Sequence, residues 1–389
     1  MAKLAWKFLT VPALVDLSSQ VQSFSRFRGK QNYLDDYSGQ QMTLTIRNNT
    51  NQIASWPIGQ GIYIYPASAP QDGQTFWVSE VQFNDQQGTT TTAGSGAAST
   101  ATVILDDWMT RAGRIQLTNF TLTTDFCLKQ MYNQITTASG ALPADMGWTP
   151  TTVGFFSALG GTYTGTVAAR INQNLKTEAW GAQLYQQAER MNLRAGRIFG
   201  DPINNAVTLQ PAKNGSTGNK YVQYQSFRRI SAGQNFINTV TVIPPVAAPQ
   251  TKTNPSSVTT YGTRFNSVST QNIDITQAAN RASWLANAQS NPNDLRYEVT
   301  FTDVQQDNTG VESLLNNYFS GSFIYLKYVV PGSGVTTTIN CSIEGISYSA
   351  NPEQTVFTVY LSLMDLYSDF ILNNAMFGVL GQSRLGQFY

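Results

Sequence analysis

Alternating apolar and polar residues predict two groups of β-strands, one near each end of the chain. From Met42 to Arg47, methionine, leucine and isoleucine alternate with threonine and arginine, which places the apolar side chains on one face of a strand. Residues typical of turns separate the strands within each group. The predicted strands are Met42–Arg47, Gly61–Tyr65, Phe76–Phe83 and Ala101–Leu105 in the first group, and Arg296–Thr302, Ser322–Tyr328, Thr336–Ile343 and Val356–Leu363 in the second.

The two strand groups have a similar layout. In each group the first and fourth strands begin about 59 residues apart, and a long polar connection follows the first strand. The second strand of each group is rich in tyrosine and is followed by a proline. We interpret this repetition as an internal duplication of one β-domain. Generic similarity between two antiparallel sheets is the alternative.

Between the strand groups, the hydrophobic period changes to that of helices. Apolar residues at helical spacing predict a helix from Leu175 to Met191, with Thr177 as its N-cap. A stripe of alanine and leucine predicts a second helix from Ile275 to Ala288. Asp274 and Gln277 have the spacing of a capping box at the start of that helix.

Three further segments have compositions typical of strands or loops. A strand is predicted at Asn238–Ile243, because valine and threonine alternate there before two prolines. The Pro, Thr and Ser-rich stretch Pro244–Thr260 is expected to be a linker or long loop. Gly88–Thr100 is of low complexity and is expected to be an exposed hairpin loop.

These patterns together predict a mainly β protein of the α+β class with three parts. A first β-barrel-like domain is expected over residues 1–130 and a second, related one over residues 291–389. Residues 131–290 are expected to form a mixed helical and β middle domain that contains the Pro, Thr and Ser-rich loop.

Charge is scarce and balanced along the 389 residues. Only 12% of the residues are charged, and 24 Lys and Arg face 23 Asp and Glu without any run of like charges. No basic stripe is therefore present to follow a phosphate backbone, which disfavours a dedicated nucleic-acid binder. The surface must be covered by amides and hydroxyls, which cost less to desolvate than ions and suit large permanent contacts. A secreted β-protein with a polar surface is an equally compatible interpretation of composition alone.

Histidine is absent, which removes the commonest general base and the commonest metal ligand. Cys127 and Cys341 lie far apart without a CxxC partner, so neither a zinc site nor a disulfide framework is predicted. We expect no catalytic residues, no metal and no cofactor. No signal peptide is predicted, and no run of about 18 apolar residues is present to span a membrane.

Two adjacent carboxylate pairs are the strongest candidates for acid–base chemistry. Adjacent strand residues point to opposite faces, so neither Asp35 and Asp36 nor Asp106 and Asp107 supply converging carboxylates for glycoside cleavage. Turn or cap roles are favoured. The cluster Gly94–Gly96 lacks both the lysine of a phosphate loop and the third glycine of a dinucleotide fingerprint, which predicts a flexible loop.

Aromatic and arginine residues are the remaining candidates for binding. The aromatics are Tyr63, Tyr65, Tyr325, Tyr328 and Tyr348. Without a basic groove beside them, packing in the core or at a subunit interface is favoured over stacking on sugars or bases. The arginines are Arg26, Arg28, Arg111, Arg114, Arg228 and Arg229. We hypothesise that some of them form ion pairs across an interface.

Several short motifs occur in an order that resembles the baseplate hub family of phage minor tail proteins. Between Phe27 and Arg47, a glycine-containing turn, a Leu-Asp pair and a small-residue turn precede a strand that ends in Arg-Asn. The predicted helix at Leu175–Met191 is followed by a Gly-Arg-hydrophobic strand at Gly196–Phe199. Further matches are Asn238–Val242, Tyr261–Arg264, the Ala-rich helix that ends in NPN, and the ending Phe377–Tyr389.

This resemblance implies a structural protein of the virion without enzymatic activity. Such hubs carry two similar tail-tube-like β-barrel domains, so a homotrimer presents six similar domains and closes the tail tube at the tip, or baseplate. The partners implied are a tail tube or distal tail protein on one side and a spike or central fibre on the other. DNA is expected to pass through the axial channel during ejection without being read, because a neutral wall does not retain a polyanion.

Two alternatives remain open on the sequence. A six-fold distal tail adaptor needs only one β-barrel per chain, and a peripheral receptor-binding or carbohydrate-active protein would use the aromatics. The chain also departs from the resemblance in two ways. It ends just after the second strand group, and amides at Asn48, Asn49, Asn51 and Gln52 replace the acidic residue typical after the first strand.

Overall fold

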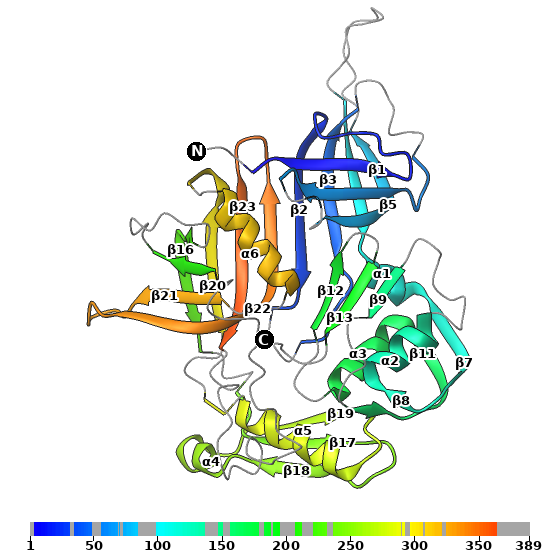
Figure 1. Cartoon of the computed structure of the whole chain (residues 1–389), viewed down its shortest axis with the longest axis vertical. Helices are drawn as coiled ribbons and strands as arrows, with labels where there is room; N and C mark the ends of the chain where they lie inside the picture. Colours follow the sequence, from blue (N-terminus) through cyan, green and yellow to red (C-terminus); the bar gives the residue numbers. More distant parts are fainter. Residues whose placement is uncertain are drawn as a thin grey trace, which may run out of the picture.

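The computed structural model describes residues 4–31, 35–48, 56–68, 70, 73–84, 99–136, 147–150, 156–178, 183–187, 190–194, 207–211, 221–231, 236–288, 290–291, 296–305, 308–320 and 324–363. The protein is mainly β, and most of its helices lie in the middle of the sequence (Figure 1). The expected mainly β fold class is confirmed. Most of the predicted loop Gly88–Thr100, and all of Gly196–Phe199 and Phe377–Tyr389, lie outside the described residues.

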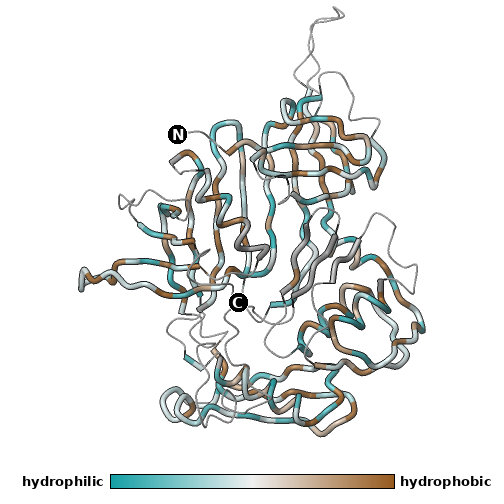
Figure 2. Tube along the Cα trace, viewed as in Figure 1, coloured by the Kyte–Doolittle hydropathy of each residue, from teal (hydrophilic) through white to brown (hydrophobic). Residues whose placement is uncertain are grey.

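The first β region turns one apolar face into the main core. Its strands are β1 (Trp6–Val11), β2 (Val21–Gly29), β3 (Gln41–Arg47), β4 (Gly61–Pro66), β5 (Gln74–Asn84) and β6 (Thr100–Asp106). Met42, Leu44 and Ile46 of β3 are fully buried, so the predicted alternation is confirmed. The same alternation of hydrophobic and hydrophilic positions follows the neighbouring strands (Figure 2).

The second β region contributes its apolar residues to the same core. Its strands are β14 (Thr208–Gln210), β15 (Tyr221–Gln223), β16 (Ser226–Ile230), β20 (Arg296–Thr302), β21 (Ile324–Val329), β22 (Thr336–Ala350) and β23 (Thr355–Leu363). The turn η4 (Asp303–Gln305) and helix α6 (Asn308–Ser320) connect β20 to β21. Val299, Phe301 and Phe357 are fully buried together with the apolar residues of β3. The four strands predicted here are all present, and β22 continues well past Ile343.

The two β regions share one strand order. β3 pairs with β6, β6 with β5 and β5 with β4, just as β20 pairs with β23, β23 with β22 and β22 with β21. At one end of this order, β2 pairs with β3 in the first region and β16 pairs with β20 in the second. At the other end, β1 pairs with β4 and β14 pairs with β21. This common order supports the interpretation as an internal duplication.

A single sheet of 13 strands runs through both β regions, because β2 pairs with β22. Among the described strands, no pairing closes either region into a barrel. The expected pair of barrels is therefore described more accurately as two repeated sheets joined edge to edge. β14, β15 and β16 also come from residues that the sequence placed in the middle domain.

A second core lies among helices and short strands that follow the first β region. The elements are α1 (Trp108–Arg114), β7 (Gln116–Leu122), β8 (Asp125–Phe126), α2 (Cys127–Gln130), the π-helix η3 (Met131–Thr136), β9 (Gly147–Pro150), β10 (Ser157–Ala158), β11 (Gly161–Thr166), α3 (Val167–Thr177), β12 (Gln183–Gln187) and β13 (Arg190–Arg194). Trp108 and Ile171 are fully buried here, and Trp77 of β5 joins this core to the first β region.

The helix predicted from Leu175 to Met191 is wrong. Helix α3 ends at Thr177, which is its last residue and does not cap a following helix. β12 and β13 form an antiparallel hairpin instead, and β13 also pairs in parallel with β9. Because β9 lies far earlier in the chain, no local hydrophobic pattern records this partner. Trp180 and Ala188, on which the prediction relied, lie outside the described residues.

Residues 236–288 form a third unit, in which a helix covers a three-stranded sheet. The elements are β17 (Thr239–Ile243), β18 (Gln250–Thr253), α4 (Pro255–Tyr261), β19 (Phe265–Ser269) and α5 (Ile275–Ala288). Helix α5 has the predicted bounds, and Ala278 and Ala282 are fully buried. The linker expected at Pro244–Thr260 is wrong from Gln250 onward, because β18 pairs with β17 and Asn254 caps α4.

Candidate interaction site at the junction of the two β regions

The two β regions meet along the second half of β22. The first half of this long strand pairs with β21, and the second half presents the same edge to β2. The register of the junction runs antiparallel from Phe24 opposite Ala350 to Gly29 opposite Gly345. The change of partner coincides with the bulge between Ile343 and Gly345. We call this contact between β2 and β22 the strand junction.

Alternate residues of β2 place cations inside the strand junction. Arg26 and Arg28 are both less than one-tenth exposed. The guanidinium carbon of Arg26 lies 4.7 Å from the ring centroid of Phe76 and 5.0 Å from that of Tyr348. Its Nη2 donates a hydrogen bond to the Gln74 side chain. Two aromatic faces and an amide therefore replace the water that this cation loses on burial.

Arg28 and Lys30 continue this row of buried cations. Arg28 Nη1 donates to the Tyr348 hydroxyl at 3.0 Å, which joins the two strands through their side chains. Lys30 lies just beyond β2, where its backbone N–H donates to the carbonyl of Glu344 at 3.0 Å. The Lys30 Nζ and the Glu344 carboxylate are 3.9 Å apart, and both side chains are buried. The bulge residue of β22 is thus the counter-ion at the end of β2.

The backbones of β2 and β22 also approach closely at Gly345. A Cβ atom at this position would lie 2.5 Å from the carbonyl oxygen of Arg28 and 2.6 Å from that of Lys30. Only glycine fits this approach without a shift of one strand. The strand junction is therefore built for adhesion between sheets, with partnered buried cations and tight backbone packing.

Arg26 and Arg28 were candidates on the sequence, but the strand that carries them was not predicted. Phe24 and the two arginines occupy alternate buried positions of β2. Arginine reads as polar in a hydrophobicity pattern, so the alternation of buried positions was hidden. Lys30 and Glu344 were missed for the same reason, because their burial depends on each other across the junction.

The two aspartate pairs are engaged in structural contacts. Asp36 forms an ion pair with Lys176 at 2.8 Å. Asp106 pairs with Arg114 and accepts from the Gln41 amide at 3.1 Å. Asp107 is the N-cap of α1 and accepts from the backbone N–H of Thr110 at 2.7 Å. The predicted preference for a cap role is confirmed for Asp107.

Two of the candidate tyrosines lie in the core, as expected. Tyr328 and Tyr348 are both buried, and Tyr348 packs edge-on against Phe357. Tyr63 and Tyr65 stand side by side on β4 with ring centroids 5.1 Å apart. The Tyr63 hydroxyl donates to the carbonyl of Pro70, so this ring is anchored to a local turn.

Arginines outside the strand junction have partners in their own chain. The guanidinium carbon of Arg111 lies 4.4 Å from the ring centroid of Trp77. Arg228 pairs with Glu298 at 3.4 Å across β16 and β20. The hypothesis of ion pairs between chains therefore does not account for these contacts or for the pairing of Arg114 with Asp106.

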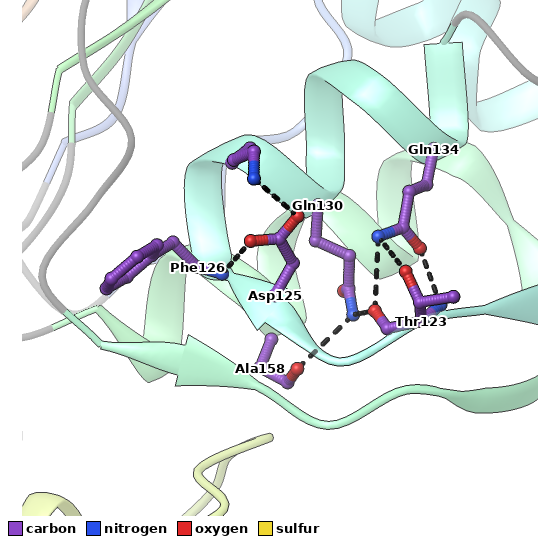
Figure 3. Close-up of polar contacts among 7 residues, drawn as sticks. Thr123, Asp125, Phe126, Gln130, Gln134 and Ala158 are labelled. Atoms are coloured by element: carbon purple, nitrogen blue, oxygen red, sulfur yellow. Dashed lines mark hydrogen bonds and ion pairs between the residues drawn. The ribbon is translucent and has the colours of Figure 1, made fainter.

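A buried amide cluster organises the helical region. The Gln130 amide donates to the carbonyls of Thr123 and Ala158 at 2.9 and 3.3 Å (Figure 3). Its oxygen accepts from Arg170 Nη2 at 3.0 Å and from the Asn174 amide at 2.9 Å. No motif in the sequence predicted this cluster, although the abundance of amides was a signal for it. Its contacts join helices and turns, which indicates a structural role.

Within the described part of the chain, no group of three or more potential metal-ligating side chains comes together. Burial raises the pKa of the Cys127 thiol well above its usual range, which keeps this thiol protonated. No helix in the described ranges is both long enough and apolar enough to cross a membrane.

Comparison with known proteins identifies the fold through structure alone. No family model matches the sequence, and no curated protein matches it. The crystal structure of the tail protein from Neisseria meningitidis MC58 is similar with a TM-score of 0.60 at 8% identity, covering 94% of this chain and 97% of that one. The 43 kDa tail protein of prophage MuSo2 from Shewanella oneidensis is similar with a TM-score of 0.54 at 13% identity, covering 94% of this chain and 98% of that one.

Proposed function

From the premise that this chain shares the fold of phage tail proteins, we propose that it is a structural protein of the virion tail. We further propose that three copies form the hub that closes the tail tube at the tip. The tail tube or a distal tail protein lies on one side of this hub, and a spike or central fibre lies on the other. DNA leaves through the axis of the ring. The three-part division into residues 1–130, 131–290 and 291–389 belongs to this proposal, with β14, β15 and β16 added to the second β region.

The observation that carries the proposal is the repeated strand order of the two β regions. A ring of three chains, each with two like units, offers six similar positions to a six-fold tube and three identical ones to a three-fold spike. The strand junction already holds two such units side by side within one chain. Closed cyclic symmetry needs the same kind of contact between chains.

The low charge of the chain fits a wall that DNA passes without binding. With 24 cationic and 23 acidic residues in 389, the chain offers little counterion release on contact with a polyanion. In the described part of the chain, the strongest candidate carboxylates are held by a lysine, an arginine and a helix N-terminus. These contacts favour a structural role over glycoside cleavage.

The first experiment is a reconstruction of the tail tip by cryo-electron microscopy without imposed symmetry. We expect three copies around the axis, each with two similar sheet units in one pseudo-six-fold ring. Six equivalent copies would replace the hub with a distal tail adaptor. Copies placed away from the axis would indicate a receptor-binding role.

A zymogram on bacterial cell walls tests the carbohydrate-active alternative. We expect no clearing by the purified chain. Clearing that disappears on substitution of Asp106 or Asp107 would contradict the structural assignment, because these carboxylates would then act on substrate.

A further inference from the structure

The registers of the two β regions align them residue by residue. Val78 lies opposite Leu105 immediately before the bulge of β5, and Ile343 lies opposite Leu361 immediately before the bulge of β22. These two pairs fix the alignment of β5 with β22. The pairing of β4 with β5 and of β21 with β22 then aligns the Ile-Tyr-Ile run of Ile62–Ile64 with the Ile-Tyr-Leu run of Ile324–Leu326. The tyrosine-rich strands noted in the sequence are thus equivalent in space.

The same alignment relates β16 to β2. Phe24 lies opposite Leu44, and Phe227 lies opposite Val299, which is the equivalent of Leu44. Ser-Phe-Ser-Arg at residues 23–26 therefore matches Ser-Phe-Arg-Arg at residues 226–229. Arg229 is the counterpart of Arg26, the cation held between two rings at the strand junction.

The alignment also gives β5 the role that β22 has in the strand junction. β4 covers β5 only from Gln74 to Trp77, as β21 covers only the first half of β22. Among the described strands, none pairs with the same edge of β5 from Glu80 to Asn84. Phe83 is the counterpart of Tyr348, but 44% of its surface is exposed, whereas Tyr348 is buried.

β16 likewise offers an outer edge. It pairs with β20 on one side, and no described strand pairs with its other side. Arg228 and Arg229 are exposed there, while Arg26 in the equivalent position is buried. β16 and β5 lie at opposite sides of the molecule (Figure 1), so one copy cannot join its own two edges. Unpaired strand edges are templates for another chain.

We propose that β16 of one copy pairs with residues Gln82–Asn84 of β5 in a second copy, in the register of the strand junction. Arg228 then lies opposite Asn84, Arg229 opposite Phe83, and Ile230 opposite Gln82. The backbone edges gain hydrogen bonds, and the Arg229 guanidinium covers the Phe83 ring as Arg26 covers Tyr348. The contact is heterologous, and repeated copies form a ring when the rotation between neighbours closes. The number of copies rests on the proposed function, but the strand pairing does not.

Paired cysteines test this register directly. Two double variants are made, one with Arg228→Cys and Asn84→Cys and the other with Arg229→Cys and Phe83→Cys. Both are needed because consecutive antiparallel pairs alternate between wide and narrow spacing. One of the two pairs then has the separation that a disulfide needs. Ser226→Cys with Asn84→Cys is the control, since a shift of two residues moves the sulfurs about 7 Å out of register. Cys127 and Cys341 are buried and stay in all variants.

Each variant is oxidised as the concentrated purified chain and in tail particles assembled in producing cells. We expect one in-register pair to give covalent oligomers on a non-reducing gel, and the out-of-register control to give none. Absence of in-register disulfides from both preparations, or equal cross-linking of the control, would overturn the proposed pairing.

The size of the covalent product separates this inference from the proposed function. A closed product of three chains supports both, whereas a closed product of six supports the strand pairing and contradicts the trimeric hub. Three copies in the cryo-EM ring without in-register disulfides would leave the hub standing and refute the strand pairing.

A second measurement avoids new covalent bonds. Phe83→Ala removes the ring from the proposed contact and should weaken self-association about tenfold, since the lost aromatic and cation–π contacts contribute about 1–2 kcal/mol. Phe265→Ala removes another exposed ring, on β19, and should leave association unchanged. Equal effects of the two substitutions in sedimentation equilibrium would contradict the proposal.

Discussion

At the scale of single residues, two opposing effects act on the pKa of Asp107, the N-cap of helix α1. Burial raises this pKa, and the hydrogen bonds of the cap lower it. The carboxylate accepts from the Thr110 backbone N–H and hydroxyl, both at 2.7 Å. Burial nevertheless raises its pKa to about 6. The folded chain therefore binds more protons than the unfolded chain between about pH 4 and pH 6. Stability from this group is present below the unfolded pKa and is lost as the pH rises through that window.

Substitutions of Asp107 should separate the cap from the charge. Asp107→Asn keeps an oxygen acceptor without a titrating group, so it should raise the melting temperature above that of the parent near pH 7 but not near pH 4. Asp107→Ala loses the cap and should destabilise by about 1 kcal/mol at both pH values. Thermal unfolding at the two pH values measures this. A parent and an Asn variant that respond identically to pH would contradict it.

The Lys30–Glu344 ion pair should be costly to break from one side. Lys30→Met leaves the buried Glu344 carboxylate without its cation, and we expect a loss of about 3–5 kcal/mol in the free energy of unfolding. Lys30→Met with Glu344→Gln removes both charges and should recover most of this loss. Denaturant unfolding of the two variants and the parent tests the coupling, and simple additivity would refute it.

Residue patterns predicted single positions well where burial follows hydrophobicity. Met42, Leu44 and Ile46 lie in the core as their alternation indicates. Arg26 and Glu344 are buried against the usual preference of charged residues, because each has a partner across the strand junction. That partner is set by the tertiary fold, so the sequence pattern around each residue does not contain it.

At the scale of elements, the approach of β2 to β22 depends on Gly345. Gly345→Ala should push the strands apart and destabilise the protein by about 1–3 kcal/mol, because the new Cβ meets two backbone carbonyls. Gly113→Ala is the matched control, since this exposed glycine lies in α1 and a Cβ there would meet only the Ala168 Cβ, at 4.0 Å. Alanine there should stabilise by about 0.5–1 kcal/mol. Melting temperatures that fall equally for both variants would contradict the close approach.

Helix α3 illustrates why one helix was misplaced along the sequence. Its buried face contains Val167, Ile171 and Leu175, but Arg170 and Asn174 are buried beside them. These two polar residues belong to the amide cluster and hide the apolar stripe from a hydrophobicity pattern. By contrast, α5 buries small apolar residues against its sheet, so its bounds were predicted correctly.

At the scale of the whole molecule, one sheet joins two regions that sequence analysis treated as separate domains. Residues of β2 pair with residues of β22 more than 300 positions later. No pattern within a window reports such a contact, although the internal repeat did indicate that the two regions are alike. The fold class and most strands of the 13-stranded sheet were therefore predictable, whereas the strand junction was not.

Native-state hydrogen exchange should reveal this continuity. We expect amides of β3 and β23 to open with one common free energy, because both regions share a single hydrophobic core. Amides of β17 and α5 should open with a different value, since the third unit has its own core. Peptide-resolved exchange in rising denaturant measures both. Separate opening of β3 and β23 would show that the strand junction does not couple the regions.

The divided edge of β22 has a geometric consequence for any closed wall built from this unit. β21 and β2 occupy successive halves of one edge, so neighbouring sheet units are displaced along the strand direction. In a cylinder of strands, such displacements add up to the shear, and shear together with strand number fixes the tilt of the strands and the radius. The location of the bulge at Glu344 therefore sets the size of the step. In the proposed ring, six repetitions of that step would determine the inner diameter.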